Sequence, residues 1–180
     1  VFIYVGKNHD DFPYYHFPYS YHLTQNELTI GIGHLNLGFR TPSSVFYLNS
    51  LFYLPLIKFY LFNMPAILIL GFSNLILIEK IFQNISKINY KFIIYFSLLV
   101  FIFINVFFYR IAEHGTDKSA QILIFILIIE VLSFINLKEK KNIIISKIYI
   151  LIGLIVSLKA FYILYVLFLL IVLYQIVKDK

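Results

Sequence analysis

Five long apolar runs constrain most strongly what this chain can fold into. They cover residues 59–78, 92–109, 119–137, 143–158 and 160–177. A hydrocarbon core about 30 Å thick is crossed by about 20 helical residues, so each run matches or nearly matches one membrane span. The runs lack the alternating polar face that a membrane β-barrel needs. The sequence therefore predicts an all-α fold, a polytopic transmembrane helix bundle with about five spanning helices.

Composition excludes a soluble globular domain. Apolar residues make up 61% of the 180 residues and charged residues only 13%, which leaves too little polar surface to coat a globule. There is no cysteine, so disulfides, thiolate metal sites and cysteine nucleophiles are excluded. The net charge of +6 comes from cations scattered between apolar runs, and we predict no nucleic-acid partner.

The last two runs meet at Lys159, which is expected to be a turn. A single helix over residues 143–177 would be about 52 Å long, well beyond the membrane thickness, so a tight helical hairpin at Lys159 is predicted. The chain then divides into an extracytoplasmic loop with interfacial helices (residues 1–58) and a transmembrane bundle (residues 59–180). Because the apolar residues 1–6 resemble the tail of a missing helix, we expect the sequence to be a fragment.

The distribution of Lys and Arg predicts the orientation of the bundle. Nine of the 15 cations fall in one set of alternating loops, with three acids, whereas the other set holds six cations and five acids. Loops rich in lysine face the cytoplasm. Residues 1–58 and 110–118 are therefore predicted to lie together on the extracytoplasmic side, as part of an integral membrane protein.

The first polar segment, KNHDDFPYYHFPYSYH, places Asp10, Asp11 and His16 among aromatic residues. One interpretation is structural: the carboxylates cap a helix or form a turn before Pro13, and the aromatic side chains form an interfacial belt. The functional interpretation is that Asp10 or Asp11 acts as a general base or helps to hold a divalent cation. The histidine spacing does not match a helical metal pair, so the metal and any other cofactor stay unknown.

The glycine-containing segment GIGHLNLGFRTPSSVFYLNSLFYL lies in the same outer region. Its glycines do not follow a strand and open a helix, so a dinucleotide-binding site is not predicted. A loop is expected there, followed by a helix that starts near residues 41–43 with a Ser, Thr or Asn cap. Residues 45–57 are too short to span and predict an interfacial helix.

The segment RIAEHGTDK (residues 110–118) joins two predicted spans. A turn would need only Gly115 and a cap such as Thr116 or Asp117. The additional ionisable residues favour a substrate-binding role, with His16 as a further candidate; the candidates in this segment are Arg110, Glu113, His114, Asp117 and Lys118.

One carboxylate, Glu130, lies well inside a predicted span. It either marks a transport pathway or pairs with a lysine near the cytoplasmic end. Lys147 and Lys159 are expected to extend toward the membrane surface, where Lys159 could meet an anionic lipid headgroup.

The motifs HDDFPYYHFPY, GHLNLGFRTPSSVFYLNSLFYLP and EHGTDKSAQIL together resemble bacterial membrane proteins of the GT-C glycosyltransferase superfamily, most closely its polysaccharide-associated branch. The resemblance covers most of the chain. It implies an enzyme of the bacterial inner membrane that takes a sugar from a polyprenyl-phosphate-linked donor in polysaccharide or cell-envelope synthesis.

By the same resemblance, Asp10 or Asp11 occupies the place of the catalytic base or metal contact, and Arg110, His114 and Lys118 would hold the lipid phosphate. Cations there would offset the charge of the departing phosphate. The acceptor stays unknown. Two alternatives remain: a transporter or flippase of a lipid-linked saccharide with Glu130 in its pathway, and a membrane subunit without chemistry.

Overall fold

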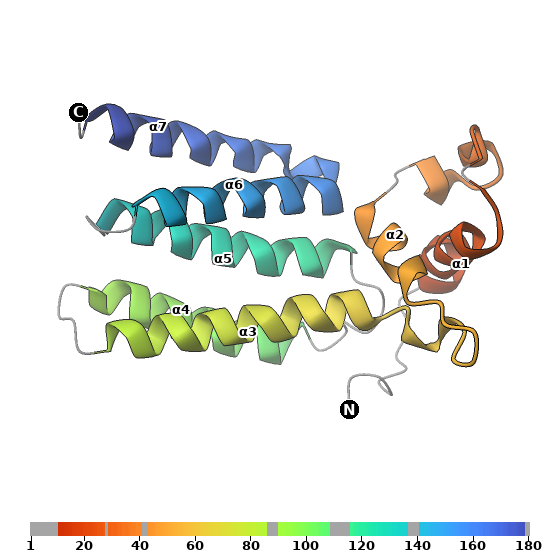
Figure 1. Ribbon diagram of the computed structural model, residues 1–180, viewed down its shortest axis with the longest axis horizontal. Coiled ribbons are helices and arrows are strands. Elements are labelled where there is room, and N and C mark those ends of the chain that lie inside the picture. Colours follow the sequence, from red (N-terminus) through yellow and green to blue (C-terminus); the bar gives the residue numbers. More distant parts are fainter. Residues whose placement is uncertain are drawn as a thin grey trace.

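The computed structural model describes residues 11–27, 29–40, 43–85, 90–108, 116–136 and 141–178. These residues form seven α-helices, which confirms the all-α prediction. The long helices lie side by side in a bundle, and α1 (Phe17–Gln25) and α2 (Ser44–Leu51) lie across one end of it (Figure 1). We call α1, α2 and the turns around them, the described residues of 11–63, the cap.

The bundle consists of α3 (Met64–Asn84), α4 (Lys91–Phe107), α5 (Thr116–Asn136), α6 (Lys141–Leu158) and a final helix that begins as the 3-10 helix η8 (Ala160–Leu167) and continues as α7 (Phe168–Lys178). Three apolar helices are long enough to cross a membrane: Phe59–Asn84, Asp117–Asn136 and Ala160–Lys178. The apolar helices α4 and α6 are shorter, so their spanning stays a prediction.

Helix α5 is the central helix, packing against α3 on one side and α6 on the other. Its apolar residues occur all around its circumference, and most of its side chains are buried in one of two apolar clusters, as expected for a helix enclosed by neighbours. Leu127 and Phe134 face the cluster shared with α6, whereas Ile122 and Ile129 face the cluster shared with α3 and α4.

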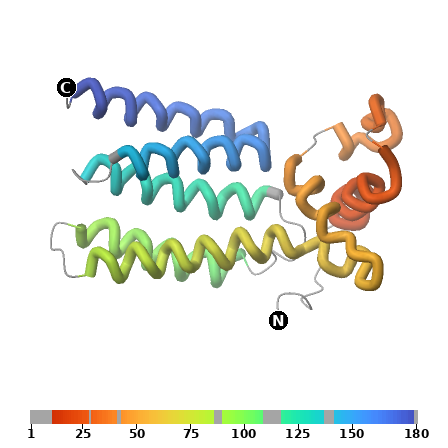
Figure 2. The backbone as a smooth tube through the Cα atoms, in the orientation of Figure 1, coloured from red at the N-terminus to blue at the C-terminus, as the bar shows by residue number. Residues whose placement is uncertain are grey.

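The predicted hairpin at Lys159 is confirmed. Helix α6 ends at Leu158, Lys159 is extended (φ −152°, ψ 112°), and η8 turns back along α6. The tube in Figure 2 follows this reversal in blue. Eight residues of 3-10 helix followed by eleven of α-helix give a rod about 32 Å long. The same residues in a continuous α-helix would be about 28 Å long. The sequence did not predict the 3-10 geometry.

Three boundaries differ from the predictions, and one of them is the end of α3, which continues to Asn84 rather than stopping at residue 78. The first run begins with a 3-10 turn, η5 (Phe59–Leu61), and α3 starts at Met64 with Pro65 in its first turn, where proline leaves the helix unbroken. The helix predicted to be interfacial, α2, ends at Leu51 rather than continuing to residue 57. Pro55 lies in the turn that follows, which is closed by a bond from Lys58 N to the Leu54 carbonyl at 2.6 Å.

Candidate functional site

Asp11 stands at the start of the short helix η2 (Phe12–His16), just before α1. Its side chain makes no capping hydrogen bond, so capping by this carboxylate is not supported. The carboxylate lies near the Tyr15 hydroxyl and interacts with it. Burial raises the pKa of Tyr15 above its usual 10.0, and the charges of Asp11 and Asp117 raise it further.

Asp117 belongs to the first turn of α5, about a hundred residues further along the chain than Asp11. The charge of Asp117 is near enough to raise the pKa of Tyr15. Its carboxylate also forms an ion pair with the Lys159 ammonium at the hairpin, and both side chains remain nearly half exposed. Two of the predicted residues, Asp11 and Asp117, thus both act electrostatically on Tyr15, and Asp117 is also paired with Lys159.

The glycine-containing segment holds Tyr15 in position. A Cβ atom on Gly38 would lie 2.4 Å from Cγ of Tyr15, so only glycine allows this approach of the backbone to the ring. Asn36 donates from its amide to the Tyr14 carbonyl at 3.0 Å and accepts from Gly38 N at 2.8 Å. Of the three glycines of this segment, Gly38 therefore supports the position of Tyr15, and sequence reasoning missed the role of Tyr15.

Helix α2 fixes the cap to the hairpin. Ser43 caps α2, accepting from Val45 N at 3.3 Å, and its hydroxyl donates to the Leu158 carbonyl at the end of α6. Ser44 and Ser157 hydroxyls lie 3.2 Å apart beside it. The last carbonyls of a helix have no partner within the helix, so Ser43 satisfies one of them from another element. The predicted cap near residues 41–43 is confirmed at Ser43.

Aromatic side chains pack between α1 and α2. The Tyr19 ring stacks on Phe39 and contacts Phe46 edge-on, with centroids 5.1 and 5.2 Å apart. Burial and the neighbouring Tyr47 hydroxyl, 3.4 Å away, raise the pKa of Tyr19 to about 12. His16 is buried, with its ring 4.4 Å from that of Tyr15 and 5.5 Å from that of Phe46.

The outer side of the last helix carries an apolar groove of about 460 Å³. It is lined by residues of η8 and the start of α7: Phe161, Tyr162, Leu164, Tyr165, Leu167, Phe168 and Ile171. Lys159 directly precedes this helix, and Gln121 of α5 donates to the Tyr162 hydroxyl at 3.3 Å. An apolar groove therefore begins next to an exposed cation.

The remaining predicted site residues have two different outcomes. Asp10, Arg110, Glu113 and His114 lie outside the described residues. Lys118 is half-buried in the first turn of α5, next to Asp117. Among the described residues, no group of three or more His, Asp or Glu side chains is arranged to hold a metal ion.

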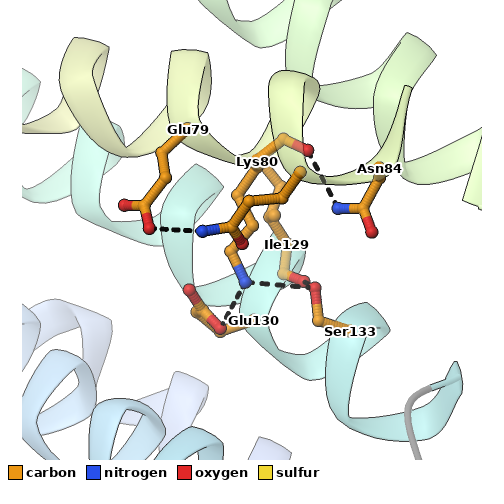
Figure 3. Close-up of polar contacts among 7 residues, drawn as sticks. Glu79, Lys80, Asn84, Ile129, Glu130 and Ser133 are labelled. Atoms are coloured by element: carbon orange, nitrogen blue, oxygen red, sulfur yellow. Dashed lines mark hydrogen bonds and ion pairs between the residues drawn. The ribbon is translucent and has the colours of Figure 1, made fainter. Parts of the chain in front are cut away.

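Glu130 lies at the other end of the bundle and forms an ion pair. Its Oε2 atom is 2.9 Å from Nζ of Lys80 on α3, and Lys80 also reaches the Ser133 hydroxyl at 3.4 Å (Figure 3). The glutamate side chain is 2% exposed and the lysine 12%. Of the two interpretations of Glu130, pairing with a lysine is the one the structure contains. Lys80, counted as a loop cation, is part of α3.

Comparisons with protein-family models, with curated proteins and with solved structures find no match for this chain. A functional conclusion must therefore come from the chemistry of its own residues.

Proposed function

We propose that this chain belongs to a membrane-embedded glycosyltransferase that moves a sugar from a polyprenyl-phosphate donor to an acceptor at the cap end of the bundle. The observation that carries the proposal is that the carboxylates of Asp11 and Asp117 both act on Tyr15, and that Asp117 pairs with Lys159, at the end of apolar helices long enough to cross a membrane. By the distribution of lysines, this end faces the extracytoplasmic side.

In the proposed reaction, Asp11 or Asp10 accepts the proton of an acceptor hydroxyl. The hydroxyl oxygen forms a bond to the anomeric carbon of the donor sugar, and the bond from that carbon to the phosphate oxygen breaks. Polyprenyl phosphate leaves with the bonding electron pair. A carboxylate at a position open to solvent is suited to this role, and a general base contributes about 10²- to 10⁴-fold to rate.

Cations would stabilise the negative charge on the departing phosphate. Lys159 meets this requirement because its ammonium is 40% exposed, and its ion pair with a half-exposed carboxylate is weak enough to be exchanged for a phosphate. Lys118, in the same turn of α5 as Asp117, is the second candidate. Arg110 and His114 keep this role as sequence predictions.

The groove on η8 and α7 fits the other half of such a donor. Its lining is almost entirely apolar, and it lies on a helix that buries only Val172 among residues 160–178. Part of an isoprenoid chain could lie in this groove with its phosphate at Lys159. A lipid-linked substrate therefore has both an apolar and a cationic contact at one place.

The test is sugar transfer by the protein in lipid nanodiscs, supplied with polyprenyl phosphates carrying radiolabelled glucose, mannose or aminoarabinose and with envelope extract as acceptor. Asp11→Asn and Asp10→Asn are each assayed, and we expect at least one to reduce release of polyprenyl phosphate by about 10²-fold or more. Glu27→Gln, an exposed carboxylate of the same cap, is the matched control and should keep full activity. Full activity in both aspartate variants would refute the assignment.

A transporter of a lipid-linked saccharide is the second candidate, because the Lys80–Glu130 pair is a charge pair inside the bundle. Transport would appear as movement of a labelled lipid-linked saccharide across proteoliposomes without a change in its covalent structure. Sensitivity of that movement to Glu130→Gln, with Asp10 and Asp11 dispensable, would favour this candidate over the transferase.

A further inference from the structure

The face of α1 directed away from the bundle forms one wall of an open cleft of about 410 Å³. Its lining residues recur every three to four positions along one face of the helix: Phe17, Pro18, Tyr21, His22, Gln25 and Asn26. Phe39 of the 3-10 helix η4 (Leu37–Arg40) closes the opposite side. The buried residues Tyr19 and Ser20 lie on the other side of α1, and Phe39 joins the cleft to the packed interior by stacking on Tyr19.

The side chains that line the cleft are mostly aromatic or polar, and none of them carries a fixed charge, which limits the kinds of ligand that fit it. Two aromatic rings of α1, Phe17 and Tyr21, stack at 5.9 Å with an interplanar angle of 14° and present an extended aromatic wall. The end of the helix adds carboxamides from Gln25 and Asn26 and the imidazole of His22. The lining contains no Lys, Arg, Asp or Glu. Such a cleft favours a ligand that is neutral, has apolar C–H faces and carries many hydroxyl groups.

We propose that this cleft binds a neutral saccharide. The weakly positive C–H groups of a sugar ring are attracted to the negative face of an aromatic ring, and carboxamides can both donate to and accept from neighbouring hydroxyls. The volume lies within the about 300–1,000 Å³ of small-molecule sites and accommodates a mono- or disaccharide. Phosphate, carboxylate and amine ligands would find no countercharge there. The Gln25 amide donates to the Thr24 hydroxyl at 2.9 Å and the Asn26 amide lies 3.1 Å from His22 Nδ1, so the carboxamide oxygens are the groups that would accept from saccharide hydroxyls.

The hydrogen bonds around His22 fix the end of this wall. The Asn26 amide lies 3.1 Å from His22 Nδ1. His22 Nε2 is buried and, among the described residues, has no hydrogen-bond partner, so a saccharide hydroxyl would reach it only after the ring turns toward the cleft. This site does not depend on the proposed transfer chemistry, because the cleft lies on the face of α1 opposite to the buried residues Tyr19 and Ser20.

Saturation-transfer NMR on the protein in lipid nanodiscs tests the proposal, with glycoside detergents omitted because their sugar heads would compete. The probes are glucose, galactose, N-acetylglucosamine and maltose, with glucuronate and glucosamine as charged counterparts. We expect saturation transfer to at least one neutral sugar and weaker transfer to its charged counterpart.

The substitutions are Tyr21→Leu and Gln25→Ala, with Tyr60→Leu as a control because Tyr60 is an exposed aromatic residue elsewhere in the cap. Each cleft substitution should weaken binding by about five- to tenfold, the usual contribution of one aromatic contact or hydrogen bond. Unchanged helical circular dichroism shows that each variant is folded. The absence of transfer to every neutral sugar, or equal effects of Tyr21→Leu and Tyr60→Leu, would overturn the proposal. Neither result bears on the transferase assay.

Discussion

Replacement of Lys80 by methionine should strongly destabilise the bundle, because it leaves Glu130 buried without its partner. Glu130 is 2% exposed and has no route to solvent, and removing one member of a buried ion pair costs about 3–5 kcal/mol. The complementary change, Glu130→Leu, should cost less. Lys80 is 12% exposed and lies one turn before the end of α3 at Asn84, so its long side chain can turn toward the membrane surface.

The double variant Lys80→Met with Glu130→Leu should be close to the wild type in stability. Two apolar side chains of similar volume replace a pair whose attraction largely offsets its cost of removal from water. If the double variant matches the wild type, the coupling free energy from this cycle equals the sum of the two single losses, which is at least about 3 kcal/mol, a change of roughly a hundredfold or more in the unfolding equilibrium. Ser133 keeps its bond to the Ile129 carbonyl at 2.7 Å in every variant.

The assay is equilibrium unfolding in mixed micelles by titration with sodium dodecyl sulfate, followed by circular dichroism because the chain has no tryptophan. Glu79→Gln is the control: Glu79 adjoins Lys80 on α3, but it is exposed and bonded only within its own helix, to Gln83 at 2.5 Å (Figure 3). Its replacement should change stability by less than about 0.5 kcal/mol. A Lys80→Met effect as small as that of the control, or a double variant that loses the sum of both single losses, would refute the reasoning.

Three further predictions concern the cap. Gly38→Ala should displace Tyr15 and reduce sugar transfer, whereas Gly71→Ala, whose added Cβ meets nothing within 4 Å, should be neutral in the same assay. Asp117→Asn should lower the pKa of Tyr15 toward 10.0, as measured by NMR titration of labelled tyrosine. Because the pKa of Tyr15 is raised in the folded protein, the stability that Tyr15 contributes is complete below about pH 10 and is lost as the pH rises through the folded pKa. An unchanged titration in Asp117→Asn would contradict an effect of Asp117 on Tyr15. Ser43→Ala removes a helix cap and a bond to α6, so it should cost about 1–3 kcal/mol of stability by the same unfolding titration; an effect no larger than that of Ser50→Ala would contradict this contact.

The bundle was predictable because it rests on local apolar runs. The limits of α5 and α6 agree with the predicted 119–137 and 143–158 to within three residues, since the polar residues at each end stop the apolar pattern. The turn at Lys159 followed from a length argument that needs no knowledge of packing. Sequence reasoning was less accurate for α2, where apolar residues continue past Leu51 but Pro55 and a tight turn end the helix earlier.

The contacts that form the candidate site were not predictable in the same way, because they join distant parts of the chain. Tyr15 is one of 15 tyrosines, and nothing in its immediate sequence separates it from Tyr14, which is mostly exposed. Its importance depends on Gly38 and on Asp117, more than 20 and 100 residues away. The glycine was the available signal: a glycine in a loop often marks the close approach of another group.

The two ion pairs of the described residues differ in a way that assigns them different roles. Lys80 and Glu130 are enclosed and largely removed from solvent, so an incoming anion would have to separate a buried pair at a cost of several kcal/mol. Asp117 and Lys159 are nearly half exposed at the cap end, where an ion pair contributes only about 0–1 kcal/mol. A phosphate could replace Asp117 as the partner of Lys159 with little loss of stability. The proposed lipid phosphate is therefore expected at the cap end, whereas the pair at the other end fixes α3 against α5.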